Sequence, residues 1–339
     1  MAIKYLDAKR IRALSSDTLP TNVPDNTIAE LTDTYMYKWF DGTDWNPIFG
    51  RGCFCSGSHS STIDYIVIQT LGNATDFGDT TTDGSSMGGE HWAGCSGVTR
   101  CLTAGGARSG NSMYNNIEYF SPSTLGNTVD YGDLTVARQK HGGTSDKSRG
   151  VFHGGSVMGT ENNTIDYVTI DTLGNATDFG DTGGGATGAP GSVSNLTRAC
   201  YGGGASDGGY SAIIWYLTIQ TTGNSADFGD LTQSREFVAG GDNDTGGRGC
   251  FGGGYNNSRF NTIDYITIAS TGNATDFGDL TSGRLGPIGV SDDTRVCWGG
   301  GDVSGSSNII DYNTIASTGN ATDFGDLTVA RKYGAGVQT

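Results

Sequence analysis

The residues best suited to chemistry recur at a nearly fixed interval in this chain. A stretch close to Asn-Ala-Thr-Asp-Phe-Gly-Asp-Leu-Thr occurs six times, and six arginines recur in step with it, with intervals of 47 to 54 residues. Carboxylates and guanidinium groups can act as acids, metal ligands or anion anchors. A single site of action would break such a repeat, so residues present in every copy are predicted to be structural. They are Asp76, Asp130, Asp178, Asp227, Asp276 and Asp323, with Arg51, Arg100, Arg149, Arg198, Arg248 and Arg295.

The Asp-Phe-Gly-Asp core of this cassette resembles motifs of two enzyme families. A protein kinase also needs a Gly-rich loop, a strand lysine and a His-Arg-Asp segment, and none of these accompanies it. The Asp-box of sialidases is more similar, because Asp76, Gly78 and Thr80 match it in the first copy. That box is a structural turn even in sialidases. We therefore interpret the Asp as a turn cap, the Gly as a tight backbone position and the Phe as packing between units.

The six repeated arginines allow two interpretations. They could line a central channel and hold an anion, or each could pair with the cassette aspartate of its own unit. One arginine and one cassette aspartate per unit favour the pairing, because a half-buried guanidinium needs a partner. Sialidase-like chemistry would also need an asymmetric arginine cluster and a Tyr–Glu pair, which the sequence does not reveal.

Metal and redox chemistry has little support. The four histidines, His59, His91, His141 and His153, are scattered and do not indicate the copper site of galactose-oxidase-like propellers. The Asp242-Asn243-Asp244 fragment lacks the other ligands of a calcium loop. No cysteine pair has Cys-x-x-Cys spacing, and we predict buried hydrophobic roles for the four that share one repeat position. These four are Cys53, Cys200, Cys250 and Cys297. We expect no catalytic residue, no metal and no cofactor.

Composition narrows the class of protein. The chain has 339 residues, 57 of them Gly, and 20 Lys plus Arg against 36 Asp plus Glu give a net charge of −16. Nucleic-acid binding needs clustered Lys and Arg, so it is not expected. No stretch of 18 apolar residues occurs, so membrane insertion is not expected either. The charged N-terminus lacks the features of a signal peptide, which predicts a protein that stays in the producing cell or leaves by lysis.

Each unit predicts four short strands, here called a to d. Strand a follows Leu-Thr-x-x-Arg, strand b runs from the repeated Arg toward Gly-Gly, strand c contains Ile-Asp-Tyr, and strand d contains Asp-Phe-Gly-Asp. Such units resemble kelch repeats, the blades of β-propellers, over residues 50–339. Residues 51–80 contain strands b, c and d of a first unit but no strand a. Residues 331–339 contain a strand a that no b, c or d follows. We therefore predict an all-β, six-bladed β-propeller closed by the C-terminal strand joining the first blade.

Residues 1–49 lie outside the repeat and are predicted to form an attachment arm. Residues 1–30 look irregular, and Asp41-Gly42 between strand-forming runs predicts a β-hairpin. The segments Ala8–Ile11, Pro20–Pro24 and Tyr37–Trp45 resemble leaders of tailed-bacteriophage structural proteins.

Residues that break the repeat are the candidates for a binding site. The c–d turns are nearly identical, which predicts one uniform face, whereas the b–c loops vary and share the other face with the d–a loops. Exposed aromatic and polar loop residues are typical of carbohydrate or protein recognition. The predicted ligand-binding residues are His59, Trp92, Tyr114, Tyr210, Tyr255, Arg259 and Phe260.

Together these features predict a non-enzymatic structural and binding module. The leader favours a phage virion component made in the host cytoplasm, either tail- or fibre-associated or decorating the capsid. Residues 1–49 would bind other virion proteins, and the loop face would bind a host glycan or surface protein; homo-oligomerisation is left open. One alternative is a sialidase- or oxidase-like propeller enzyme, which predicts a polar pocket of non-repeating residues at the channel mouth. The other is an intracellular kelch-type interaction adaptor.

Overall fold

The structure is a computed structural model of the 339-residue chain. It describes residues 4–7, 10–13, 17–24, 28–31, 36–40, 45–47, 50–58, 60–81, 93–108, 112–183, 188–206 and 209–338. The chain forms two compact units, Met1–Arg51 and Gly52–Thr339, and each is considered by itself. No helix in the described part is long and apolar enough to cross a membrane.

The first unit contains a five-stranded sheet in the order β1-β2-β3-β4-β5. The predicted hairpin is confirmed, since β4 and β5 pair antiparallel with Phe40 opposite Trp45, although its tip at residues 41–44 lies outside the described residues. The expectation that residues 1–30 are irregular is wrong, because three strands fall there and β2 pairs parallel with β3. The strands are β1 (Lys4–Asp7), β2 (Arg10–Ala13), β3 (Ile28–Leu31), β4 (Met36–Phe40) and β5 (Trp45–Pro47).

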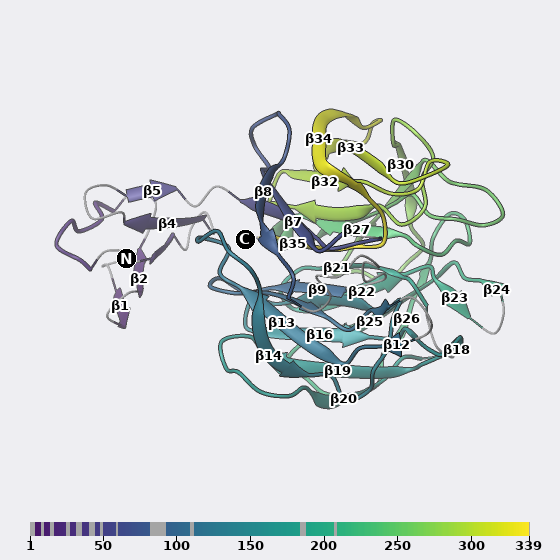
Figure 1. Cartoon of the computed structure of the whole chain (residues 1–339), viewed down its shortest axis with the longest axis horizontal. Coiled ribbons are helices and arrows are strands. Elements are labelled where there is room, and N and C mark those ends of the chain that lie inside the picture. Colours follow the sequence, from purple (N-terminus) through teal and green to yellow (C-terminus); the bar gives the residue numbers. More distant parts are fainter. Residues whose placement is uncertain are drawn as a thin grey trace. The chain divides into compact units, whose positions relative to one another are not determined.

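The second unit consists of six four-stranded antiparallel sheets (Figure 1), which confirms the predicted six-bladed propeller. Within each blade the strands lie in the order a-b-c-d. Blades 1 to 3 are β35 (Ala335–Gln338), β6 (Arg51–Cys55), β7 (Thr62–Val67) and β8 (Thr75–Asp79); β9 (Ala93–Ser96), β10 (Cys101–Ala104), β13 (Asn116–Phe120) and β14 (Val129–Asp133); and β15 (Gly142–Ser145), β16 (Arg149–His153), β19 (Thr164–Thr169) and β20 (Thr177–Asp181).

Blades 4 to 6 repeat the same order. They are β21 (Gly191–Ser194), β22 (Arg198–Gly202), β25 (Ile213–Thr218) and β26 (Ala226–Asp230); β27 (Ala239–Asp242), β28 (Arg248–Gly252), β29 (Thr262–Thr267) and β30 (Thr275–Asp279); and β31 (Ile288–Ser291), β32 (Arg295–Gly299), β33 (Ser307–Thr314) and β34 (Thr322–Arg331). Short hairpins in b–c loops are β11 (Ala107–Arg108) with β12 (Ser112–Met113), β17 (Ser156–Val157) with β18 (Thr160–Glu161), and β23 (Ala205–Ser206) with β24 (Gly209–Tyr210). A 3₁₀ turn, η1 (Asp244–Gly246), joins β27 to β28.

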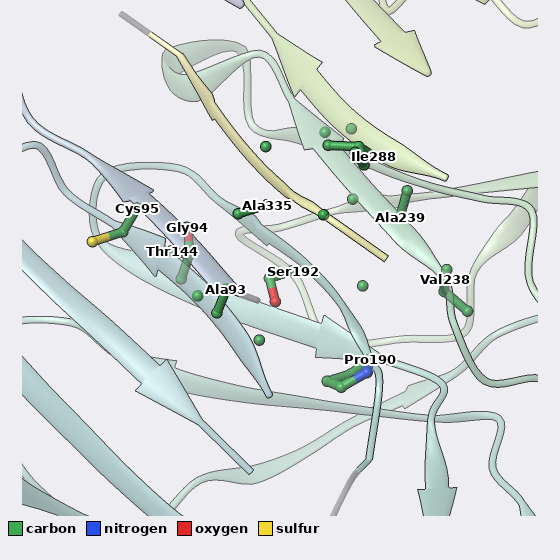
Figure 2. A pocket seen from close by; sticks show the side chains of 18 of the residues that line it. Ala93, Gly94, Cys95, Thr144, Pro190, Ser192, Val238, Ala239, Ile288 and Ala335 are labelled. Atoms are coloured by element: carbon green, nitrogen blue, oxygen red, sulfur yellow. The ribbon is translucent and has the colours of Figure 1, made fainter. Parts of the chain in front are cut away.

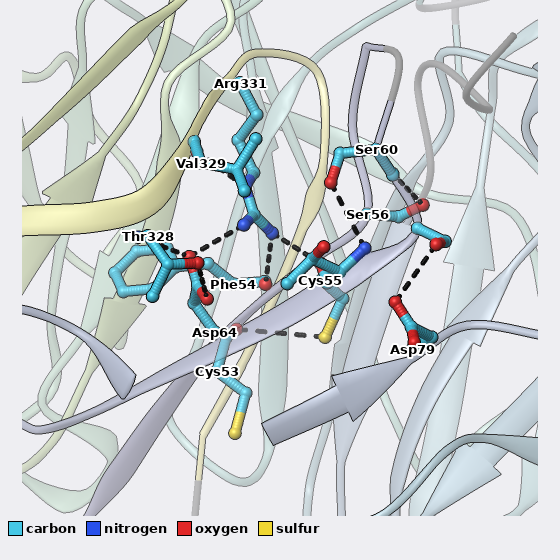
Figure 3. Close-up of polar contacts among 12 residues, drawn as sticks. Cys53, Phe54, Cys55, Ser56, Ser60, Asp64, Asp79, Thr328, Val329 and Arg331 are labelled. Atoms are coloured by element: carbon cyan, nitrogen blue, oxygen red, sulfur yellow. Dashed lines mark hydrogen bonds and ion pairs between the residues drawn. The ribbon is translucent and has the colours of Figure 1, made fainter. Parts of the chain in front are cut away.

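The C-terminal strand closes the ring, as predicted. β35 pairs antiparallel with β6, with Ala335 opposite Cys55. Just before β35, the Arg331 guanidinium forms an ion pair with Asp64 of strand c at 2.7 Å, and Thr328 donates its hydroxyl proton to the same carboxylate at 2.5 Å (Figure 3). Strands from both ends of the propeller sequence therefore build one blade, which protects edges that would otherwise be open for pairing.

The cassette joins each blade to the next. Phe77 is buried at the boundary of blades 1 and 2 and packs on Phe120 with ring centroids 4.9 Å apart. Gly78 has φ of 148°, and a Cβ there would lie 2.4 Å from the carbonyl oxygen of Gly126 in the next c–d turn. Gly126 donates its N–H to the Phe77 carbonyl at 2.9 Å, and equivalent contacts recur at all six blade boundaries. The repeated glycine and aromatic residue thus hold neighbouring blades together.

The predicted pairing between strand-b arginines and cassette aspartates is wrong for the five arginines from Arg100 to Arg295. The Arg149 guanidinium donates to the backbone carbonyl of Ile219 at 3.1 Å and lies over the Tyr167 ring, 4.4 Å from its centroid. The same two contacts recur for Arg100, Arg198, Arg248 and Arg295. The six cassette aspartates are instead exposed. A carbonyl and an aromatic face satisfy a half-buried guanidinium without a carboxylate.

A different set of arginines forms the buried ion pairs. The Arg of Leu-Thr-x-x-Arg reaches the strand-c Asp of the following blade, and both side chains are fully buried. Threonine of the same segment donates two hydrogen bonds to that carboxylate, as Thr232 does to Asp264. The four pairs are Arg138–Asp166, Arg235–Asp264, Arg284–Asp311 and Arg331–Asp64.

The other two blade boundaries have neither the Arg nor the Asp. Glu118 of blade 2 replaces the Asp and accepts hydrogen bonds from the hydroxyls of Thr81 and Thr128. Trp215 of blade 4 replaces it at the second boundary and lies against Gly183, where a Cβ would be 2.5 Å from the ring. Arg and Asp are therefore present together or absent together, as expected of residues that need one another when buried.

The seven cysteines are all buried and free. This agrees with the predicted role of Cys53, Cys200, Cys250 and Cys297 as small core residues. Burial raises the pKa of the Cys200 and Cys250 thiols to about 12, so they are neutral and poorly reactive.

Candidate functional site

The inner strands of the six blades enclose a central channel that is too narrow for a large ligand. Its cavity measures about 140 Å³, below the roughly 300–1,000 Å³ of typical ligand pockets. Figure 2 shows the small side chains of Ala93, Ala239 and Ala335 around it. Glycine at the second inner-strand position brings neighbouring backbones close, since a Cβ on Gly289 would lie 2.1 Å from the Gly240 oxygen. The same cavity is also lined by Lys140, Phe237 and Tyr333, which lie just before the inner strands β15, β27 and β35.

A collar of five residues surrounds the mouth on the side of the d–a loops. Each lies two residues before an inner strand, has left-handed backbone geometry with φ of 57° to 61°, and is linked to the next by a hydrogen bond. Four hydrogen bonds of 2.5 to 3.0 Å join the five residues in order, and in each the later residue donates its N–H to the carbonyl of the one before it. The collar residues are Lys140, Ala189, Phe237, Gly286 and Tyr333. The equivalent residue of blade 2 lies among residues 82–92, outside the described part.

The side chains of this collar break the repeat. Gly286 adopts the left-handed geometry at no steric cost, whereas Phe237 and Tyr333 do so at a cost of about 1 kcal/mol or more each. Their rings contact each other with centroids 5.0 Å apart, and the Lys140 ammonium lies 4.8 Å from the Phe237 centroid. All three side chains are half-buried. The backbone geometry requires only glycine here, so it does not by itself explain the choice of aromatic residues.

The variable b–c loops join this collar to form one continuous surface. The roots of four such loops pair with a residue beside the collar, as Tyr255 does with Glu236 through two backbone hydrogen bonds of 2.8 and 3.0 Å. Burial and the carboxylate of Glu161 raise the pKa of Glu236, and the ammonium of Lys140 lowers it in part. Equivalent pairings are Gln139 with Ser156, Gly188 with Ala205, and Leu285 with Asp302.

The structure brings together some of the sequence-predicted site residues. Tyr210 and Tyr255 come from adjacent blades and meet edge to face with ring centroids 6.1 Å apart. Both are half-buried, so each presents part of its ring to solvent beside the collar. Phe260 is half-buried in the loop of Tyr255, and Tyr114 lies in the b–c loop of blade 2, two blades from Tyr210. His59 and Trp92 lie outside the described residues.

Arg259 has a partner within the protein. Its guanidinium contacts Asp302 at 2.6 Å, and the Lys332 ammonium contacts the second oxygen of the same carboxylate at 2.6 Å. Burial opposes ionisation of Asp302, but these two cations and the N–H of Gly305 outweigh it and hold its pKa below the usual range. Arg259 therefore fixes a loop of blade 6 and is not an open anion anchor.

A buried polar cluster beneath the collar was not predicted from the sequence. The Ser192 hydroxyl lies 3.0 Å from Nε2 of His153, whose ring stacks on Tyr201 with a centroid separation of 3.9 Å. His141 lies nearby and packs edge to face on Phe152. Burial, aided by the nearby Arg138 charge, lowers the pKa of His153 to about 3 and that of His141 well below its usual range. Aligning the copies would have revealed this cluster, because Ser192 stands where the other inner strands have glycine.

The arrangement offers few means for catalysis or metal binding. The Ser192–His153 contact resembles part of a nucleophile–base pair, but within the described part of the chain Nδ1 of His153 has no hydrogen-bond partner to orient the ring. His153 is fully buried and the adjoining cavity is small. Among the described residues, no group of three or more His, Cys, Asp or Glu side chains could hold a metal ion.

Fold and site together define a six-bladed β-propeller with a repeat-breaking mouth. No family model and no curated protein sequence matches the chain. Its function must therefore be inferred from the site itself.

Proposed function

We propose that the protein is a non-enzymatic binding module that recognises a saccharide at its channel mouth. The observation that carries this proposal is the collar, where Phe237 and Tyr333 occupy left-handed backbone positions that Gly286 fills without strain. Strained positions of this kind cluster at functional sites. The residues retained there supply an aromatic surface next to polar groups, which is the chemistry that binds sugar rings.

The surrounding loops extend the same surface. Tyr210 and Tyr255 add a second aromatic pair, and Glu236 and Lys140 supply an acceptor and donors beside the collar. The positively charged side chains and the carboxylates named around the mouth are equal in number, so their charges cancel. A neutral saccharide therefore suits the site better than a strongly charged one.

The test is binding to a glycan array, followed by titration of any hit against collar variants. Phe237→Gly introduces the residue that the chain itself uses at Gly286, so the fold is expected to persist. We expect at least about tenfold weaker binding for Phe237→Gly and for Tyr255→Ala, about the contribution of one aromatic contact. Ala189→Gly is the matched control and should bind normally. Retention of full affinity by both aromatic variants would refute the site.

We further propose that the module belongs to a phage virion, with residues 1–49 as its attachment segment. Support comes from the leader-like segments of the sequence and from the separate compact unit formed by Met1–Arg51. Mass spectrometry of purified particles would give its presence and copy number. Its absence from particles would rule out the virion assignment and leave the saccharide site to be judged alone.

A further inference from the structure

The c–d turns, opposite in each blade to the b–c loops, differ between two halves of the propeller. All six turns share one backbone, in which a glycine with φ of 148° to 156° donates its N–H to the preceding blade. The residue before that glycine is leucine in blades 1 to 3 and threonine in blades 4 to 6. The leucines are Leu71, Leu125 and Leu173, and the threonines are Thr222, Thr271 and Thr318.

The three leucines are exposed although the turn does not need them. Leu71 and Leu125 are 54% exposed and Leu173 is 53% exposed. The exposed threonines of the other three turns show that the same backbone forms without an apolar side chain. Folding therefore does not account for leucine here.

Exposed apolar side chains concentrate on this part of the surface. Seven large hydrophobic residues are exposed in the described part of the chain, and four of them lie on the c–d turns and strand d of blades 1 to 3. The fourth is Val129, 50% exposed, in a register position where most other blades have threonine. Single exposed leucines are ordinary, but a group at one register on consecutive blades is typical of an interaction surface.

The strands next to these leucines carry exposed cassette aspartates. Each turn lies against the cassette of the preceding blade, so Leu125 neighbours the strand that carries Asp76 and Asp79. No ion pair within the described part involves either aspartate of any cassette. The half-buried strand-b arginines supply one positive charge per blade against these two negative ones. The surface is therefore apolar and acidic.

We infer that the leucine arc, defined as Leu71, Leu125, Leu173 and Val129, docks a partner protein whose surface is apolar and flanked by Lys or Arg. Charge decides the occupant. A second copy would place one acidic belt against another on a chain with net charge −16, which opposes self-association through this surface. A basic partner would instead gain electrostatic steering from the belt and affinity from the leucines. This surface is distinct from the saccharide site and does not depend on it.

A random peptide library provides the probe. Peptides displayed on ribosomes are first depleted on the full-length triple variant Leu71→Thr/Leu125→Thr/Leu173→Thr and then selected on the wild-type protein. The variant uses the side chains of the sister turns, so its folding is expected to be intact, and circular dichroism verifies this. We expect enrichment of peptides that combine Lys or Arg with Leu, Phe or Trp.

Affinities of two synthesised peptides decide the outcome. Fluorescence anisotropy should show at least about 30-fold weaker binding to the triple variant and marked weakening in high salt. Met158→Thr, which alters the most exposed of these apolar residues, is the control and should bind within about twofold of wild type. No enrichment, acidic or salt-insensitive peptides, or equal binding by the triple variant would overturn the inference. A concentration-dependent dimer that the triple variant abolishes would also overturn it, because a second copy would then be the occupant.

Discussion

Removal of Arg331 should destabilise the propeller more than any surface ion pair would suggest. This side chain closes the ring by donating to the carbonyls of Phe54 and Thr62 at 3.1 and 2.5 Å and to Asp64 at 2.7 Å. Arg331→Met would leave a buried carboxylate and two buried carbonyls without these donors. An uncompensated buried charge costs about 3–5 kcal/mol, and each unsatisfied carbonyl adds about 1 kcal/mol or more.

We therefore expect Arg331→Met to lower the free energy of unfolding by about 3–5 kcal/mol, measured by urea titration of tryptophan fluorescence. The double variant Arg331→Met/Asp64→Leu removes both charges. It should recover a large part of the loss, since replacing both partners of a buried ion pair with apolar residues is often nearly neutral. The blade boundaries at Glu118 and Trp215, which form without the pair, support that expectation.

Arg259→Met provides the control for this experiment. Arg259 pairs with Asp302 at a partly exposed site, so its loss should cost about 1 kcal/mol or less. If Arg331→Met were no more destabilising than Arg259→Met, or if the double variant were as unstable as the single one, the proposed role of the buried pairs would be refuted.

Three further predictions concern the channel. His153 stays neutral when folded, so stability should fall as pH drops below the unfolded pKa of about 6.5, by about 2–3 kcal/mol at pH 4.5, and His153→Phe should flatten this slope in pH-dependent urea titrations. Burial and Asp244 raise the pKa of Asp242 to about 8, so folded stability should fall as pH rises from 4 toward 8; Asp242→Ser should stabilise by about 2–4 kcal/mol at pH 7.5 and by little at pH 4. Gly289→Ala should lower the melting temperature by several degrees because its Cβ would meet the Gly240 oxygen at 2.1 Å, whereas Gly188→Ala has 3.9 Å of clearance and should be tolerated.

The repeat made the blade count and ring closure predictable. Cassette spacing fixed the number of blades, and the missing strand a before Arg51 indicated where the C-terminal strand pairs. The ion-pair partners were not predictable in the same way. Strand-b arginines, cassette aspartates and strand-c aspartates all recur with one period, so spacing alone cannot decide which meet. One sequence signal does identify the partners. The Arg of Leu-Thr-x-x-Arg and the strand-c Asp of the following blade are missing together at two boundaries and present together at the other four.

The site was harder to predict because loop composition does not reveal backbone conformation. Tyr210 and Tyr255 were found from their types, but Phe237 and Tyr333 look like ordinary hydrophobic residues next to an inner strand. Only their left-handed φ, compared with Gly286 in the same register, distinguishes them from core residues. The expectation of a uniform c–d turn face overlooked the leucine-to-threonine change for a related reason, since both residues suit the turn.

Repetition gives this protein an internal reference for separating folding from function. Where six copies share a backbone but not a side chain, the simplest residue among the copies shows what the fold requires, and any larger one needs another explanation. Glycine is sufficient in the collar and threonine is sufficient in the c–d turn, yet aromatic residues and leucines occur there. Ser192 follows the same logic, because glycine suffices at its register in the other described inner strands, and its hydroxyl contacts His153. The three departures lie at the mouth, on the opposite turns and in the channel wall, so substitution to the sister residue tests each one without removing the fold.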